Sequence, residues 1–338
     1  MKNNILIVTG GTGGHILPAI NIFNELSKDR SVILIINKNA KNKFFNFLNY
    51  NPNKGRVIFS ENISYSWKFL YIFLKTILLN FKYVYNSKYI LSFSSLHTLP
   101  ILFLSVLLRK KIYLQELDSV INRTNRVFLF FVDKILTNFF HTNDIPKKYN
   151  KKIYNIGVVI NKLSIVDSKN VIFVMGATNG WEIFDKKISN ILGNIKNYII
   201  YHNCRKENLK YLENFYKNMG VKAIVSEYFK NYEYIISISR IIITRGGAYS
   251  LAYICAYNKN AIIIPWEKAV NNHQFINSKK VLDVNGGIVV EEKNINNISK
   301  YINYFLKNTS SIGGNMNKVF KVVDANKYVY EFLKLIER

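Results

Sequence analysis

A glycine-rich segment, Gly10-Gly11-Thr12-Gly13-Gly14, directly follows the apolar run Ile5–Thr9 and precedes a helical pattern of apolar residues. Glycines at such a place let the backbone come close to a ligand, and the free N–H groups at a helix start attract an anion. The alternative is a tight strand-to-helix turn that needs positive φ angles. Four glycines in five positions exceed what a turn requires, so the segment predicts contact with an anionic ligand.

The spacing of these glycines excludes two common nucleotide-binding loops. A dinucleotide fingerprint built on Gly11 and Gly13 would need a third glycine where Ile16 stands, and no acid ends the second strand near Asn37. The phosphate-binding pattern G-x-x-x-x-G-K-[ST] is absent from the sequence. A nicotinamide enzyme and a P-loop NTPase are therefore both disfavoured.

Three further polar segments follow apolar runs in the second half of the chain. They are 244–250, which contains Arg245 and two glycines, the Asn-His-Gln segment 272–277, and the turn 175–180. Arg245 offers a fixed positive charge to a phosphate or to a nearby acid. Each segment alone is compatible with an ordinary connection. Together they follow strands of one sheet, at the edge where α/β proteins form ligand crevices.

Short β-rich runs alternate with longer helical segments along the whole chain. The first series is Ile5–Thr9, Val32–Ile36, Tyr89–Phe93, Lys111–Leu114 and Lys134–Thr137, and the second is Val171–Met175, Tyr198–Tyr201, Ala223–Ser226, Arg240–Thr244 and Ala261–Pro265. Alternation with nearly all-apolar strands predicts parallel sheets covered by helices on both faces. We expect an α/β protein of two doubly wound domains with a cleft between them. The domain boundary is expected between Val159 and Lys169, and Val322–Arg338 reads as a closing helix.

Composition sets the broad class of protein. The chain has 338 residues, of which 49% are hydrophobic, and only two cysteines, Cys204 and Cys255. This is a globular composition without a disulfide framework or a Cys-rich zinc site, and a reducing, cytoplasmic setting fits it. No cleavable signal is visible, and the uncharged run Tyr89–Leu108 is too interrupted by polar residues and Pro to be expected as a membrane span.

The net charge of +26, from 47 Lys and Arg against 21 Asp and Glu, has three competing explanations. Lys, Asn and Ile are favoured by AT-rich codons, which makes compositional drift one cause. An anionic membrane surface is the second. Nucleic acid ranks last, because the basic residues are spread along the chain without a nucleic-acid-binding signature.

The segment Ser66–Lys82 is apolar nearly all round and carries scattered lysines. Its aromatic and leucine side chains with interspersed Lys are typical of a helix that lies in a membrane interface. The alternative is an ordinary helix packed on the sheet. We expect Trp67, Phe69, Phe73 and Lys75 to contact the membrane.

The motifs together resemble the MurG family, the UDP-N-acetylglucosamine–N-acetylmuramyl-(pentapeptide) pyrophosphoryl-undecaprenol N-acetylglucosamine transferases. The resemblance rests on the N-terminal glycine segment through Ala19, on Gln115–Asn125, on Arg245–Ala248 and on Asn272–Asn277, and so covers nearly the whole chain. It implies the GT-B fold, with two Rossmann-like domains. Residues 1–160 would form an acceptor- and membrane-facing domain on which helix 322–338 packs, and residues 161–321 a UDP-sugar-binding domain.

The resemblance also implies an activity and its partners. An inverting transferase of this family moves GlcNAc from UDP-GlcNAc to the MurNAc 4-hydroxyl of undecaprenyl-pyrophosphoryl lipid I. The product is lipid II, made for peptidoglycan on the cytoplasmic face of the bacterial cell membrane. No metal and no cofactor are expected, and the partners are the two substrates and an anionic membrane surface rather than nucleic acid.

Residue roles carry over position by position. The resemblance assigns to UDP-GlcNAc the residues Thr12, Gly13, Gly14, Asp118, Asn161, Ala177, Phe229, Arg245, Gly247, Ala248, Tyr249, Ser250, Leu251, Ala252, Tyr253, His273 and Gln274. Gly10, Gly11, Thr124 and Asn125 would face the acceptor diphosphate. As the base that deprotonates the acceptor hydroxyl, His15 is the first candidate because it follows the glycine segment and an imidazole titrates near neutral pH. Its alternative role is that of a helix-start residue that binds the loop or the acceptor diphosphate. Glu116 is the second candidate, and its alternative role is to hold Thr124 or Asn125. His97 is expected to be a solvent-facing loop residue.

This chain departs from the family pattern at several of these positions. The family has Glu where Tyr253 stands, for the ribose diol, and Arg where Asn161 stands; it has Asn at Asp118 and a glycine-rich loop where Ser92–Leu96 stands. A changed donor or acceptor, or a non-catalytic protein that binds lipid or a partner, therefore remains an alternative function.

Overall fold

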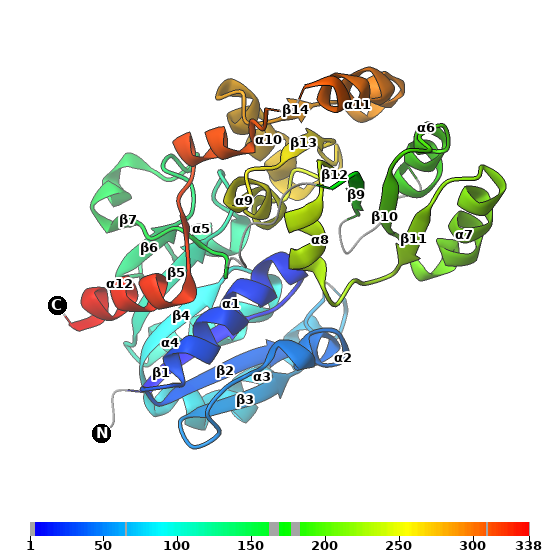
Figure 1. Ribbon diagram of the computed structural model, residues 1–338. Helices are drawn as coiled ribbons and strands as arrows, with labels where there is room; N and C mark the ends of the chain where they lie inside the picture. The colour runs from blue at the N-terminus through cyan, green and yellow to red at the C-terminus, as the bar shows by residue number, and fades with distance from the viewer. Residues whose placement is uncertain (1–3, 65, 162–168, 177–182, 309, 338) are drawn as a thin grey trace. The chain divides into compact units, whose positions relative to one another are not determined.

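The computed structural model describes residues 4–64, 66–161, 169–176, 183–308 and 310–337. The chain folds into two compact units, one of residues 1–161 with 321–338 and one of residues 162–320. Each is an α/β unit built on its own parallel sheet (Figure 1).

The first unit contains a seven-stranded sheet in the order β3-β2-β1-β4-β5-β6-β7, with every neighbouring pair parallel. Its strands are β1 (Asn4–Thr9), β2 (Val32–Asn37), β3 (Gly55–Ser60), β4 (Ser87–Phe93), β5 (Lys111–Glu116), β6 (Lys134–Thr137) and β7 (Ile153–Asn155). Its helices are α1 (Gly13–Leu26), α2 (Lys41–Phe44), α3 (Phe69–Tyr85), α4 (Leu99–Leu107), α5 (Arg123–Phe128) and α12 (Ala325–Glu337). A short pair, β8 (Val158–Val159) and β15 (Val322–Val323), ties the returning chain to this unit.

Helices cover both faces of this sheet because its strands are apolar on both sides. In β1, Ile5 and Ile7 join the core that includes α1 and α12, whereas Leu6 and Val8 join the core that includes α4 and α5. Successive strand residues point to opposite faces, so one apolar strand serves two cores. Helices α1 and α12 pack against each other although they lie at opposite ends of the sequence (Figure 1).

The second unit has a six-stranded parallel sheet in the order β11-β10-β9-β12-β13-β14. The strands are β9 (Val171–Met175), β10 (Ile199–Asn203), β11 (Ala223–Ser226), β12 (Ile241–Thr244), β13 (Asn260–Ile263) and β14 (Ile288–Val289). The helices are α6 (Ser189–Leu192), α7 (Leu209–Asn218), α8 (Tyr232–Ile238), α9 (Ala248–Ala256), α10 (His273–Asp283) and α11 (Ile298–Lys307), and a π-helical segment spans Ile183–Ile188.

The predicted fold class is confirmed, since two α/β sheets with parallel strands are present. Strands β6, β9 and β11 have the predicted bounds, and the other predicted strands lie within about two residues of them. The expected closing helix begins too early, because Val322 and Val323 form β15 and α12 starts at Ala325. The sequence also did not indicate β3, β7, β8, β14 and β15. These strands are short or largely half-buried, so their apolar signal is weak. Within the described residues, no helix has both the length and the apolar character that crossing a membrane requires.

Candidate functional site

The N-terminal glycine segment forms an open turn between β1 and α1. Gly11 and Thr12 are exposed, and Gly11 adopts φ +84°, a backbone conformation that favours glycine. Helix α1 starts at Gly13, and Thr12 makes no side-chain capping hydrogen bond there. The 14-residue helix therefore begins directly after two exposed residues, and its positive dipole end lies next to them.

His97 lies against this turn. A side chain at Gly10 would collide with it, because a Cβ there would be 2.8 Å from the His97 Cβ. The backbone N–H of Ile63 donates to His97 Nδ1 at 2.9 Å, so the imidazole proton is on Nε2. Burial lowers the pKa of His97, which keeps the ring neutral. The expectation of a solvent-facing histidine is wrong: the side chain is half-buried and held in place.

His15, the first candidate base, occupies the opening turn of α1. Its side chain is half-buried, and its backbone oxygen accepts a hydrogen bond from the Thr9 hydroxyl at 3.0 Å. That bond joins the end of β1 to the first turn of the helix and so fixes the path of the glycine segment. His15 thus lies in the first turn of α1, directly after the glycine segment.

Glu116, the second candidate base, is completely buried at the end of β5. Its carboxylate accepts hydrogen bonds from the Asn125 side chain at 3.0 Å and from the backbone N–H groups of Asn122 at 3.0 Å and Asp118 at 3.3 Å. Burial raises the pKa of Glu116 to about 8, and Asp118 adds to the rise, while these hydrogen bonds oppose it. The contacts match the alternative role from the sequence, in which Glu116 holds Asn125.

In the second unit, the two motifs 244–250 and 272–277 are bonded together. The side-chain amide of Asn277 donates to the carbonyl oxygen of Gly246 at 3.0 Å. The backbone N–H of Trp266 donates to Gln274 Oε1 at 3.0 Å, so the amide nitrogen of Gln274 is the end that can donate to a ligand. His273 donates through Nδ1 to the carbonyl oxygen of Val270 at 2.6 Å, since a carbonyl can only accept. The buried bond from Asn277 thus ties α10 to the glycine-bearing loop before α9, 31 positions earlier in the sequence.

Arg245 points into the protein interior. Its side chain is 2% exposed, it forms an ion pair with Glu292, and it donates to the carbonyl oxygen of Ile264 at 3.1 Å. Its guanidinium lies over the ring of Phe184, 4.5 Å from the centroid. The sequence leaves open whether Arg245 pairs with a phosphate or with an acidic side chain. In the structure its partner is the acid Glu292.

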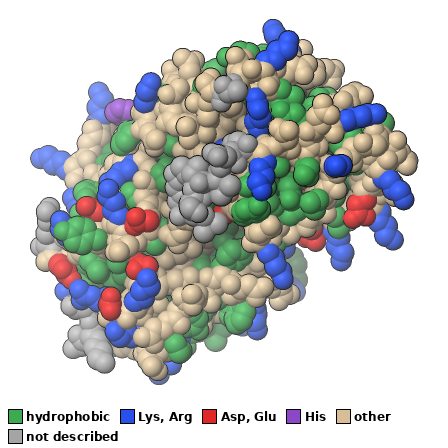
Figure 2. Space-filling model, in the orientation of Figure 1, with side chains coloured by type: hydrophobic (Ala, Val, Ile, Leu, Met, Phe, Trp, Pro, Cys, Tyr) green, Lys and Arg blue, Asp and Glu red, His purple; other side chains and the backbone are tan. Residues whose placement is uncertain are grey.

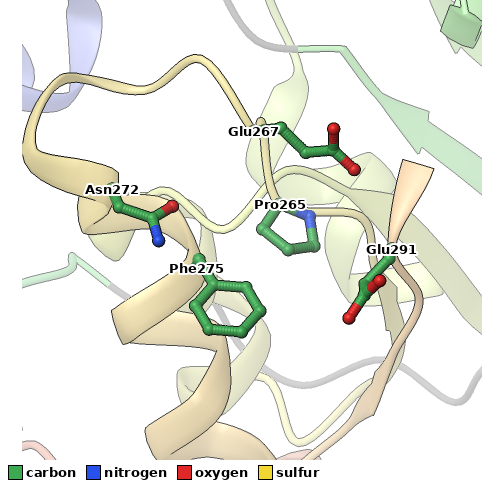
Figure 3. Close-up of a pocket in the computed structure, with 5 residues that line it drawn as sticks. All are labelled: Pro265, Glu267, Asn272, Phe275 and Glu291. Carbon is green, nitrogen blue, oxygen red and sulfur yellow. The ribbon is translucent and has the colours of Figure 1, made fainter. Parts of the chain in front are cut away.

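A cavity of about 200 Å³ lies beside the start of α10. Asn272 and Phe275 line one side of it, and Pro265, Glu267 and Glu291 line the other (Figure 3). Two carboxylates and an amide in one concave space are suited to hydroxyl groups of a polar ligand. The sequence analysis missed both glutamates, because nothing in their local spacing sets them apart from other acidic residues.

An aromatic cluster lies beside another acid that the sequence analysis missed, Glu233. The ring of Tyr253 meets those of Tyr232 and Tyr249 with centroids 5.5 and 5.1 Å apart, and Phe229 packs edge-on against Phe173 at 5.9 Å. The Tyr253 hydroxyl donates to Glu233 Oε1 at 2.9 Å.

The remaining predicted residues have varied environments. Leu251 and Ala252 are fully buried, and Ala248 is nearly so; Asp118, Thr124, Gly14, Gly247 and Ser250 are half-buried. Asn161 is exposed, and its side-chain oxygen accepts a hydrogen bond from the backbone N–H of Ala325 at 3.1 Å, at the start of α12. Ala177 lies outside the described residues.

Comparisons with known proteins agree over both units. The chain matches the glycosyltransferase family 28 N-terminal domain over residues 5–137 and the C-terminal domain of the same family over residues 171–329.

Individual relatives cover the chain almost end to end. The UDP-N-acetylglucosamine–N-acetylmuramyl-(pentapeptide) pyrophosphoryl-undecaprenol N-acetylglucosamine transferase of Wolbachia sp. subsp. Drosophila simulans (strain wRi) is 27% identical over 348 residues, which is 98% of each chain. The transferase of the same name from Campylobacter fetus is 28% identical over 307 residues, 86% of this chain and 88% of that protein.

Among solved structures, the crystal structure of Acinetobacter baumannii MurG aligns with a TM-score of 0.71 and 16% identity, covering 100% of this chain and 99% of that one. This likeness shows the GT-B fold. Together with the two domain matches and the full-length relatives, it shows that the chain is an enzyme and belongs to glycosyltransferase family 28, the family of the MurG transferases.

Proposed function

We propose that this enzyme transfers GlcNAc from UDP-GlcNAc to the MurNAc 4-hydroxyl of undecaprenyl-pyrophosphoryl lipid I, forming lipid II for peptidoglycan. The observation that carries the proposal is the bond between Asn277 and Gly246, which ties together the two segments that the resemblance assigns to the donor. One turn before Asn277, Gln274 presents its amide nitrogen as a donor to sugar hydroxyls, because its oxygen is held by the backbone N–H of Trp266. The names of the full-length relatives support the same substrates.

The chemistry requires a base for the acceptor hydroxyl and stabilisation of the leaving diphosphate. In the proposed mechanism His15, in the first turn of α1, takes the proton, and the outward N–H groups at the glycine turn hold diphosphate oxygens. Glu116 acts indirectly, since its carboxylate is buried and fixes the loop 117–125. Arg245 likewise does not touch phosphate in this mechanism. Its ion pair with Glu292 holds the loop 244–250 in place.

The test is a transfer assay with purified enzyme, radiolabelled UDP-GlcNAc and lipid I. We expect labelled lipid II, a loss of turnover of about 100-fold or more in His15→Ala, and a raised KM for UDP-GlcNAc in Gln274→Ala. Transfer from UDP-glucose or UDP-GalNAc in preference to UDP-GlcNAc would assign a changed donor. Absence of any nucleotide-sugar binding would instead favour a non-catalytic role.

We also propose that α3 and α4 attach the enzyme to an anionic membrane surface. Helix α3 buries Thr76, Asn80 and Val84, whereas Leu70, Leu74 and Leu78 are 65%, 51% and 76% exposed. An ordinary helix on a sheet would bury the leucines. Exposed apolar patches of this kind mark interaction sites, and a membrane interface accommodates leucine together with lysine.

The residues expected at the membrane divide into two groups. Trp67 is 88% exposed and available for insertion. Phe69 and Phe73 are half-buried and stack on each other, and Phe73 also meets Phe103 of α4, so they stiffen the helix pair. Lys75 pairs with Glu61 at 3.2 Å. The exposed leucines are therefore better candidates for insertion than the two phenylalanines.

A further inference from the structure

A series of buried hydrogen bonds joins α12 to the end of β5. The hydroxyl of Tyr328 in α12 donates to Gln115 Oε1 in β5, 213 positions earlier in the sequence. Gln115 Nε2 donates to Asn138 Oδ1 at 2.8 Å, and Asn138 Nδ2 donates to the carbonyl oxygen of Leu117 at 3.3 Å. The three side chains are at most 2% exposed, so water does not compete for these bonds. We refer to the series, from Tyr328 to Leu117, as the relay.

The direction of every bond in the relay follows from its last acceptor. A backbone carbonyl can only accept, so the Asn138 amide turns its nitrogen to Leu117 and its oxygen to Gln115. Gln115 must then donate through its nitrogen, which leaves its oxygen facing α12. Burial raises the pKa of Tyr328, so the phenol keeps its proton and is the donor that this oxygen needs. The orientation of each amide thus depends on the next group in the relay.

The relay ends at the loop 117–125, which the buried carboxylate of Glu116 also holds. Leu117 is the first residue of that loop. The backbone oxygen of Gln115 accepts a hydrogen bond from the Asn125 side chain at 3.4 Å, and the same side chain donates to Glu116 at 3.0 Å. The two ends of the loop are therefore bonded to groups that the relay keeps in place.

We propose that Tyr328 is a positioning residue that holds the loop 117–125 in its acceptor-binding arrangement from the last helix of the chain. Without the phenol hydroxyl, the Gln115 oxygen loses its donor in a buried place, and the amide gains by reversing. Asn138 then reverses with it, and the Leu117 carbonyl loses its hydrogen bond. The inference rests on the proposed function, because it takes Thr124 and Asn125 in this loop to face the acceptor diphosphate.

A second tyrosine bonded to the same helix provides a matched control. The Tyr154 hydroxyl in β7 donates to Glu331 Oε2 in α12 at 2.6 Å. Strand β7 is the edge strand of the sheet, and β6 separates it from β5. Tyr154→Phe therefore removes a bond between α12 and the sheet and leaves every side chain of the relay in place.

The experiment measures KM for lipid I and for UDP-GlcNAc separately, with the purified full chain. We expect Tyr328→Phe to raise KM for lipid I about fivefold, the effect of one buried hydrogen bond, with KM for UDP-GlcNAc unchanged. Tyr154→Phe should keep both values. Gln115→Met breaks the same relay from β5 and should raise KM for lipid I to a similar extent. In that background Tyr328→Phe should add nothing, because the two residues act through one series of bonds.

Hydrogen exchange tests the same coupling without turnover. Backbone amides of residues 117–125 should exchange faster in Tyr328→Phe than in wild type, and at the wild-type rate in Tyr154→Phe. A general loosening of α12 would instead speed exchange in that helix in both variants and leave the loop unchanged.

The results that would overturn the inference are distinguishable. Equal rises of KM for lipid I in Tyr328→Phe and Tyr154→Phe would mean that α12 only supports the sheet. Wild-type KM and wild-type loop exchange in Tyr328→Phe would mean that the relay does not hold the loop, and the proposed function would be unaffected. If the wild type does not transfer GlcNAc to lipid I, the proposed function fails and takes the acceptor role of this loop with it.

Discussion

At the scale of single residues, the Arg245 side chain is 2% exposed and its ion-pair partner Glu292 is 16% exposed. Removing either one leaves the other charge without compensation in a poorly solvated place. We expect Arg245→Met to cost about 3–5 kcal/mol in free energy of unfolding, measured as a lower midpoint of urea unfolding. Glu292→Gln should show a loss in the same direction.

The opposite result would be informative. An Arg245→Met protein with unchanged unfolding but abolished UDP binding would mean that the guanidinium contacts phosphate directly, against its position in the structure. Arg240→Met offers a control, because among the described residues Arg240 donates to backbone carbonyl oxygens, that of Leu306 at 2.9 Å among them.

Glu116 predicts a dependence of stability on pH. Its pKa is raised in the folded protein to about 8, so the folded state keeps a proton that the unfolded chain releases above about 4.5. The contribution is fully present below the unfolded pKa and is lost as the pH rises toward 8. Thermal unfolding of wild type and Glu116→Gln at pH 5.5 and 8.5 tests this. The wild type should lose more stability than the variant over that interval, and equal losses would contradict the raised pKa.

At the scale of elements, the exposed leucines of α3 lead to a prediction about membrane binding. Because Leu74 and Leu78 point outward, replacing both with Asp should leave the core intact. Each leucine buried in an apolar phase contributes about 1.5–3 kcal/mol, so binding to vesicles containing phosphatidylglycerol should fall at least about tenfold. Co-sedimentation with such vesicles measures it.

A matched control is available in the other unit. Leu282 on α10 is also exposed, at 47%, and Leu282→Asp should bind vesicles like wild type. Equal loss in both variants would point to a general charge effect, and no loss in the α3 variant would remove the membrane assignment from this helix.

At the scale of the whole molecule, the charge is distributed rather than focused. Figure 2 shows Lys and Arg side chains over the whole visible face and few acidic ones. With a net charge of +26, attraction to an anionic surface adds to any apolar insertion. Binding to anionic vesicles should therefore weaken markedly between about 50 and 300 mM salt, as screening shortens the reach of these charges.

Vesicles of neutral lipid separate the two contributions. Binding to them should be weaker and nearly independent of salt, because only insertion of apolar side chains remains. If anionic vesicles show the same independence, the charge has no role in attachment, and compositional drift is the better explanation for it.

The sequence by itself determined the fold class, most strands and the motif positions. Apolar strands that alternate with helices have few ways to bury both faces of the sheet they form. A glycine before a helix start permits a positive φ angle, as at Gly11. Strand periodicity and glycine position are local properties that a few neighbouring residues reveal. The family likeness also depends on such segments, and the domain matches confirm it.

Only the tertiary structure decided which polar groups meet. Arg245 pairs with Glu292, Tyr253 with Glu233 and Asn277 with Gly246 across 20 to 47 positions of sequence, through packing that no local pattern encodes. The direction of α3 was likewise open, since a helix that is apolar nearly all round does not reveal which side it buries. The neighbouring elements decide it, and here Thr76, Asn80 and Val84 face inward while several leucines of α3 stay exposed.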